Sequence, residues 1–159
     1  MASVSVWEPV TNTTHPMIAA VAIISLAAME KPARWRWWLA CFSTLIAVIV
    51  ASKLLTSRMR PDQTTRDSFP SGHAAVAAFV AAAAFVRLAE RSAGGPTWME
   101  SAVAATVVAW AVVAGAARIE ARRHHIGDVV VGWAIGGCAG AVAAVYGRSA
   151  PVRRIAEGS

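Results

Sequence analysis

Three short polar blocks interrupt an otherwise apolar chain, and their residue types suit phosphoryl transfer. Six residues separate Lys53 from Arg60 and Pro61, the second block is Pro70–His73, and the third contains Arg118, His124 and Asp128. Lysine and arginine bind phosphate oxygens, and a histidine can attack phosphorus or donate a proton. A carboxylate can orient that histidine. The blocks together supply anion binding, a nucleophile and an acid.

The second block suits an anion because Ser71 and Gly72 stand where a helix is expected to begin. A helix start offers free backbone N–H groups and the positive end of the helix dipole, and His73 would follow in the first turn. Ser71 and Gly72 could also be only a helix cap, and each cation alone could be an interfacial charge that reaches the lipid headgroups. Ionisable groups beside apolar segments are costly, so their combination favours a functional site.

In the third block, two histidines compete for one carboxylate. His124 lies four residues before Asp128, and the two share a helix face if the helix begins before His124. A carboxylate on one ring nitrogen would fix the tautomer and leave the other nitrogen free to attack. His125, three residues before Asp128, could reach the same carboxylate.

The composition predicts a membrane protein. Of 159 residues 57% are hydrophobic and 15% charged, and a membrane span needs about 20 mostly apolar residues. The apolar residues form five runs, of which the first and third are short: Met17–Met29, Trp37–Leu55, Ala74–Val86, Ser101–Ala117 and Val129–Tyr146. A chain of this length could not bury five such helices. We therefore expect an all-α bundle of about five transmembrane helices in a single domain, 1–159, with a short N-terminal segment, 1–16, and a basic cytoplasmic tail, 147–159.

Alternation of these helices places all three polar blocks on the same side of the membrane. The net charge of +6 does not indicate nucleic acid, because the charges follow the span ends. Eight cations lie on the side opposite the blocks: Lys31, Arg34, Arg36, Arg87, Arg91, Arg148, Arg153 and Arg154. Outside the blocks themselves, the other side holds only Arg58, Arg66, Arg122 and Arg123. Because positive charge favours the cytoplasm, we expect a plasma-membrane protein with the blocks and the N-terminus outside and the C-terminus inside.

Smaller features refine this expectation. Met1–Pro16 lacks the basic start of a signal peptide, so the first apolar run is expected to remain as a helix. Gly132, Gly136 and Gly140 lie along one face of the last helix, which favours close helix packing. The two cysteines, Cys41 and Cys138, sit within apolar runs and indicate neither a disulfide nor a metal site.

The ordered blocks resemble the type-2 phosphatidic acid phosphatase superfamily, also called lipid phosphate phosphatases. The family pattern is Lys, six residues, Arg-Pro; then Pro-Ser-Gly-His; then Ser-Arg, five residues, His, three residues, Asp. The chain matches ten identities, and the spacing from Arg118 selects His124 over His125. Ala117 replaces the usual serine, which could weaken a secondary phosphate contact. Many bacterial members have six spans, and the first of these is the one missing from the expected pattern.

The resemblance implies a mechanism. His124 attacks phosphorus to form a phosphohistidine, Asp128 stabilises the imidazolium, and His73 protonates the departing alkoxide and later assists water. The phosphoryl oxygens would be held by Lys53, Arg60, Ser71, Gly72 and Arg118. With so many cations we expect no metal and no other cofactor, and Asp62 and Asp67 form no acidic cluster that would bind one.

The expected partner is a lipid phosphate within the membrane. The compact chain resembles phosphatases of polyprenyl carriers in bacterial cell-wall synthesis, such as the decaprenylphosphoryl-phosphoribose phosphatases of actinobacteria. Phosphatidic acid, phosphatidylglycerophosphate and undecaprenyl diphosphate remain alternative substrates. Vanadate-dependent haloperoxidases share this anion site, but they are soluble and much larger. A membrane scaffold without activity is the third class, and the presence of both histidines and Asp128 argues against it.

Overall fold

The computed structural model describes residues 32–90 and 96–149, which form a bundle of α-helices with no strand in those two ranges. The helices are α3 (Pro32–Thr56), α4 (Gly72–Glu90), α5 (Trp98–Glu120) and α6 (Ile126–Ser149). Each is long and apolar enough to cross a membrane. The expected all-helical membrane bundle is therefore confirmed for the last four apolar runs. The first run, Met17–Met29, lies outside the described residues.

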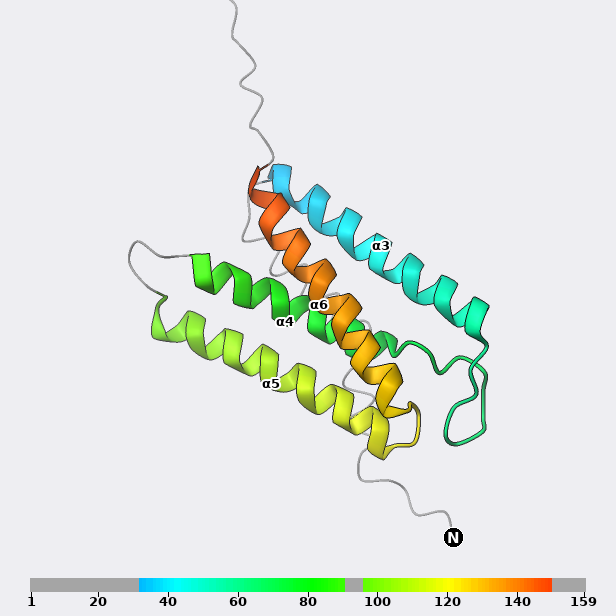
Figure 1. The fold of residues 1–159 in the computed structure, drawn as a ribbon. Coiled ribbons are helices and arrows are strands. Elements are labelled where there is room, and N and C mark those ends of the chain that lie inside the picture. Colours follow the sequence, from blue (N-terminus) through cyan, green and yellow to red (C-terminus); the bar gives the residue numbers. More distant parts are fainter. Residues whose placement is uncertain (1–31, 91–95, 150–159) are drawn as a thin grey trace, which may run out of the picture.

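Helices α4 and α6 form the centre of the bundle, with α5 packed on α4 and α3 packed on α6 (Figure 1). The buried face of α4 consists mainly of alanines, and Phe79 is its largest fully buried side chain. Two aromatic rings of α3, Trp38 and Phe42, meet the Phe79 ring edge-on, each with ring centroids 5.7 Å apart. Edge-to-face aromatic contacts add to the burial of apolar area and fix α3 against the central pair.

Three glycines of α6 let its backbone touch the backbone of α4. A Cβ atom on Gly136 would lie 1.9 Å from the Ala75 carbonyl oxygen, and one on Gly140 would lie 2.2 Å from that of Phe79. A Cβ on Gly132 would lie 2.6 Å from the carbonyl oxygen of Ser71. Any side chain at these positions would force the helices apart, so the predicted close packing along this glycine face is confirmed.

The end of α5 that carries Arg118 is held against α6 by one tryptophan. The indole Nε1 of Trp133 donates a hydrogen bond to the Ala111 carbonyl oxygen at 3.2 Å. The Trp133 ring covers Gly115, where a Cβ would lie 2.3 Å from the ring. The last turn of α5 therefore has a fixed position beside the start of α6.

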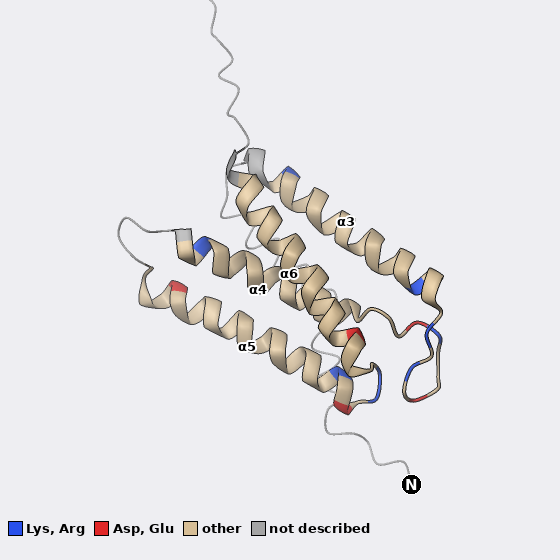
Figure 2. Ribbon diagram, in the orientation of Figure 1, with Lys and Arg blue, Asp and Glu red and all other residues tan. Residues whose placement is uncertain are grey.

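The α3–α4 loop and the α5–α6 turn meet at the same end of the bundle (Figure 1). Charged side chains gather at the helix ends and in these loops, and the middle of each helix has none (Figure 2). The backbone N–H of Asp62 donates to the Arg122 carbonyl at 3.2 Å, and that of Ser71 donates to the Asp128 carbonyl at 2.9 Å. The three polar blocks thus converge as their order along the chain predicts. Helix α6 continues to Ser149, and the rest of the expected tail, 150–159, lies outside the described residues.

Candidate active site

The spacing between Arg118 and His124 follows from a tight chain reversal at the end of α5. The carbonyl oxygen of Arg118 accepts hydrogen bonds from the backbone N–H groups of Arg123 at 3.1 Å and of His124 at 3.2 Å. Arg122 adopts the left-handed conformation, with φ of 52°, that lets the chain turn back after a helix. This reversal fixes the position of His124 relative to the last turn of α5.

His124 is buried, and its ring has a defined orientation. Its Nδ1 lies 2.7 Å from the backbone carbonyl oxygen of Ser68. Because a carbonyl oxygen can only accept, Nδ1 carries the hydrogen, and Nε2 therefore has the free lone pair. Burial and the positive charges of Arg118, Lys53 and Arg60 lower the pKa of His124 from 6.5 to about 4, although the Ser68 contact acts in the opposite direction. The ring is consequently neutral at neutral pH, and Nε2 is available as a nucleophile.

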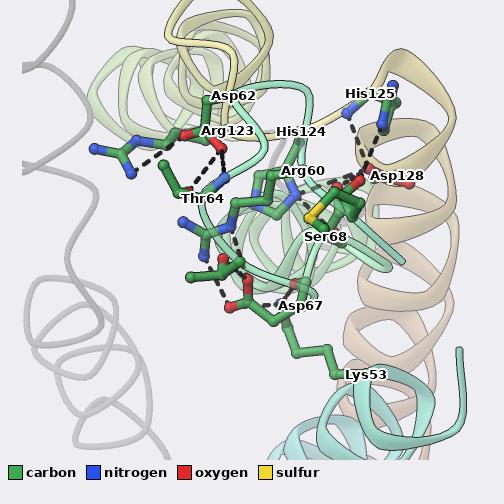
Figure 3. Close-up of polar contacts among 12 residues, drawn as sticks. Lys53, Arg60, Asp62, Thr64, Asp67, Ser68, Arg123, His124, His125 and Asp128 are labelled. Atoms are coloured by element: carbon green, nitrogen blue, oxygen red, sulfur yellow. Dashed lines mark hydrogen bonds and ion pairs between the residues drawn. The ribbon is translucent and has the colours of Figure 1, made fainter. Parts of the chain in front are cut away.

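The carboxylate of Asp128 is fully buried and has three hydrogen-bond donors. Arg58 Nη1 donates to Oδ1 at 2.9 Å. The Ser68 hydroxyl and the His125 backbone N–H, the latter at 2.9 Å, donate to Oδ2 (Figure 3). His125 directly precedes α6, so an acidic side chain three residues later can accept from its N–H, as in a capping box. Capping of α6 thus explains why a carboxylate stands at this position.

The condition under which His124 and Asp128 would share a helix face is not met. Helix α6 begins at Ile126, after both histidines, because the reversal around the Arg118 carbonyl occupies the preceding residues. His124 Nδ1 lies 4.0 Å from Asp128 Oδ2, a distance suited to an ion pair with a charged imidazolium but not to a hydrogen bond. The tautomer of His124 is therefore set by the Ser68 carbonyl and not by the Asp128 carboxylate.

The competing histidine has a different environment. His125 Nε2 lies 3.2 Å from the Met59 carbonyl oxygen, and its ring is more exposed than that of His124. Only its backbone N–H contacts Asp128 among the hydrogen bonds described above. The His124 ring is buried, and burial and the cations of the polar blocks lower its pKa.

The two cations of the first block converge on Asp67 (Figure 3). Arg60 contacts its carboxylate through Nη2 and Nε, each 2.8 Å from a different oxygen. Lys53 Nζ lies 3.9 Å from Asp67 Oδ2 and also donates a hydrogen bond to the Asp67 backbone carbonyl. Lys53, in the last turn of α3, and Arg60, in the loop, thus point toward one anionic group.

Three polar atoms of the site are buried and make no hydrogen bond within residues 32–90 and 96–149. These atoms are the hydroxyl oxygen of Ser71, Nε of Arg118 and Nε of Arg60, of which the last lies at ion-pair distance from Asp67. Ser71 therefore does not use its side chain to cap α4, although its N–H and carbonyl oxygen are both bonded. Buried polar atoms nearly always have a partner, so a hydroxyl donor and a guanidinium in this state suit a phosphate oxygen. Gly72 and His73 are the first two residues of α4, and His73 is half-buried.

Sequence reasoning missed three residues that build this site. Ser68 bonds both His124 and Asp128, Arg58 pairs with Asp128, and Asp67 pairs with the first-block cations. From the sequence, Arg58 contributed only to the predicted membrane orientation, and Asp67 was considered only as an acidic residue that could bind a metal. Ser68, two residues before Pro70, was the one with a usable signal, because a serine next to a polar block is a candidate member of it.

The arrangement can perform phosphoryl transfer. A neutral imidazole with a free Nε2 lies close enough to three cations for their charges to lower its pKa. Such cations stabilise the charge that develops on the phosphoryl oxygens, and a buried carboxylate 4.0 Å away can stabilise the imidazolium.

Comparison with known proteins identifies the family. No curated protein and no solved structure matched the chain. The family model described as the PAP2 superfamily matches residues 36–150, which include all four described helices except the first residues of α3, and all three polar blocks. Members of this superfamily are generally phosphatases. The chain therefore belongs to the PAP2 superfamily, and this membership supports phosphatase activity in general.

Proposed function

We propose that this protein is a metal-independent lipid phosphate phosphatase that hydrolyses a phosphomonoester through a phosphohistidine on His124. The observation that carries the proposal is the state of the His124 ring. Its Nδ1 hydrogen is held by the Ser68 carbonyl at 2.7 Å, and its pKa of about 4 keeps Nε2 unprotonated at neutral pH. A buried imidazole with this tautomer is a nucleophile that needs no further base.

In the first step, His124 Nε2 forms a bond to phosphorus as the bond from phosphorus to the lipid oxygen breaks. His73 donates a proton to the departing alkoxide, which leaves as an alcohol. The positive charge on the phosphorylated imidazole is stabilised by Asp128, 4.0 Å from Nδ1. Transfer needs little covalent chemistry from the protein beyond this, because positioning and electrostatic stabilisation dominate the barrier.

In the second step, water attacks phosphorus and gives a proton to His73, and the phosphorus–nitrogen bond breaks. Inorganic phosphate leaves, and His124 returns to its neutral state with the hydrogen on Nδ1. Lys53, Arg60, Ser71, Gly72 and Arg118 bind the phosphoryl oxygens in both steps. Support for this set comes from the buried Ser71 hydroxyl and Arg118 Nε, neither of which bonds another described group.

The substrate we favour is a polyprenyl-linked phosphate of cell-wall synthesis. Two features support an amphiphilic substrate: the site lies at one end of four membrane-length helices, and these helices expose large apolar side chains. The loop between the first two blocks is short, and the described residues include no added domain for headgroup recognition. We place the site on the extracytoplasmic side of the plasma membrane.

The test is phosphate release by purified protein in detergent from a panel of lipid phosphates in excess EDTA. The panel contains a polyprenyl-linked pentose phosphate, phosphatidic acid, phosphatidylglycerophosphate and undecaprenyl diphosphate. We expect release to persist in EDTA and the polyprenyl-linked monoester to have the highest kcat/KM. Strict dependence on magnesium would reject the mechanism, and preference for another lipid would correct the substrate.

His124→Ala and His73→Ala should each lower kcat by about 10⁴ or more, as removal of an activated nucleophile does in other covalent enzymes. His125→Ala is the matched control, because it removes the adjacent imidazole and leaves the backbone N–H that bonds Asp128. An inactive His125→Ala beside an active His124→Ala would assign the nucleophile to the other histidine.

A further inference from the structure

The side chain of Asp67 holds the two cations that the proposed site assigns to phosphate. Both carboxylate oxygens lie 2.8 Å from an Arg60 nitrogen: Nη2 donates a hydrogen bond to Oδ2, and Nε is in ion-pair contact with Oδ1 without a hydrogen bond. Guanidinium groups bind phosphate oxygens from the same edge. The same carboxylate lies 3.9 Å from Lys53 Nζ. Asp67 therefore occupies, with respect to these two residues, the position of a bound anion.

The Asp67 carboxylate is charged and partly exposed. Partial burial raises its pKa, but the Thr65 hydrogen bond and the charge of Arg60 outweigh this and lower the pKa below 3.8. Its side chain is 44% exposed, whereas that of Arg60 is only 16% exposed. Solvent can therefore reach the carboxylate, whereas the arginine side chain is largely enclosed.

We propose that Asp67 is an internal counter-anion that competes with the substrate phosphate for Arg60 and Lys53. This inference rests on the proposed function, because it concerns the same phosphate site. When the substrate binds, its phosphate oxygens replace the Asp67 carboxylate at the Arg60 guanidinium and the Lys53 ammonium. The Asp67 side chain then turns away. When phosphate leaves, the carboxylate re-forms both ion pairs.

The positive charge of the phosphate site explains why a competing carboxylate such as Asp67 would be useful. Without Asp67, the three cations Lys53, Arg60 and Arg118 would face inorganic phosphate with no other carboxylate described in contact with them. A product held by three cations without a carboxylate in contact would leave more slowly, and product release limits turnover in many enzymes. Asp67 weakens the binding of both substrate and product, so it sets the affinity of the site.

The test is the affinity of purified protein in detergent for inorganic phosphate, measured by titration calorimetry and by product inhibition. Asp67→Asn removes the charge and keeps the shape of the side chain. We expect the Kd and the inhibition constant to fall by about threefold or more, since the exposed ion pairs that compete are individually weak. The KM for the lipid substrate should fall in parallel.

Asp62→Asn is the matched control, because it removes the same charge from the same loop. Asp62 bonds Thr64 and lies 3.5 Å from Arg123, and no hydrogen bond or ion pair joins it to Lys53 or Arg60 in the described residues. We expect a smaller change in phosphate affinity than for Asp67→Asn. Asp67→Ala, whose side chain reaches neither cation, is the second variant and should also bind phosphate more tightly than wild type.

The possible outcomes separate the inference from the proposed function. Unchanged or weaker phosphate binding in both Asp67 variants would mean that Asp67 positions the cations, which overturns the inference alone. An equal gain of phosphate affinity in Asp62→Asn would mean that the net charge of the loop causes the effect, and this would also overturn the inference. A wild-type protein that binds no phosphate and shows no product inhibition would overturn the proposed phosphate site itself.

Discussion

The lone pair of His124 depends on two separate properties of its surroundings. The Ser68 carbonyl determines which ring nitrogen carries the hydrogen. Burial among cations lowers the pKa of the ring, so that the ring is neutral and only one of its nitrogens is protonated. Neither property belongs to the histidine as a residue type, whose ordinary pKa of 6.5 would leave a fraction protonated at neutral pH. In the proposed mechanism, His124 therefore acts as a nucleophile without a hydrogen-bonded carboxylate on its ring.

The lowered pKa of His124 predicts a pH dependence of stability in the phosphate-free protein. A histidine whose folded-state pKa is depressed stabilises the fold above its unfolded value of 6.5, and this contribution is lost as pH falls toward about 4. His124→Asn keeps a donor for the Ser68 carbonyl and does not titrate. We expect wild type to lose up to roughly 3 kcal/mol relative to this variant over that range, measured as thermal unfolding in detergent. A difference between the two proteins that stays constant with pH would contradict the lowered pKa.

At the scale of the elements, the glycine face of α6 connects the second and third polar blocks. It brings the α6 backbone against α4 at Ser71, Ala75 and Phe79. At the loop end of this contact, the Ser71 N–H donates to the Asp128 carbonyl at 2.9 Å. The separation of α4 and α6 therefore sets the separation of the residues that each contributes to the site.

Two adjacent glycines of α6 provide a direct test of this packing. A Cβ on Gly136 would lie 1.9 Å from the Ala75 carbonyl oxygen, whereas a Cβ on Gly137 would meet nothing within 4 Å. Gly136→Ala should destabilise the protein by about 1–3 kcal/mol, as overpacking does, and should lower kcat by separating the helices. Gly137→Ala should be neutral or slightly stabilising. Thermal unfolding and phosphate release check both, and equal behaviour of the two variants would contradict the close contact.

At the scale of the whole molecule, four spans with both site loops at one end give the protein a functional side and an opposite side (Figure 2). From the order of the apolar runs, the sequence predicts that the cations outside the polar blocks are more numerous at the opposite side. Positive charge is retained in the cytoplasm during insertion, so the site end is expected outside the cell membrane. A substrate exposed on the outer leaflet would reach the site without crossing the bilayer.

Cysteine labelling can test this orientation. Cys41 and Cys138 are free and lie within membrane-spanning helices, so both are first replaced by alanine. Arg66→Cys then places a thiol on the exposed α3–α4 loop, and Trp98→Cys places one at the opposite end, at the exposed first residue of α5. We expect a membrane-impermeant maleimide to label only the first in intact cells and both after permeabilisation. The reverse pattern would place the active site in the cytoplasm.

The sequence by itself determined the membrane bundle, the convergence of the polar blocks and the identity of the charged groups. Apolar length identifies a span, and alternation of spans places the loop after α3 and the turn after α5 at one end. Even the glycine contact was predictable, because four-residue spacing places Gly132, Gly136 and Gly140 on one helix face. These features depend on local pattern or on counting helices.

Only the tertiary structure decided how the charged groups pair. The Ser68 carbonyl that orients His124 is 56 residues away along the chain, and Arg58 is 70 residues from Asp128. These contacts depend on the path of an irregular loop and on a chain reversal, and neither has a periodicity that a sequence displays. The start of α6 after His124, and not before it, likewise follows from hydrogen bonds to the Arg118 carbonyl. The sequence therefore supplies the reacting groups, and packing decides which neighbour each one contacts.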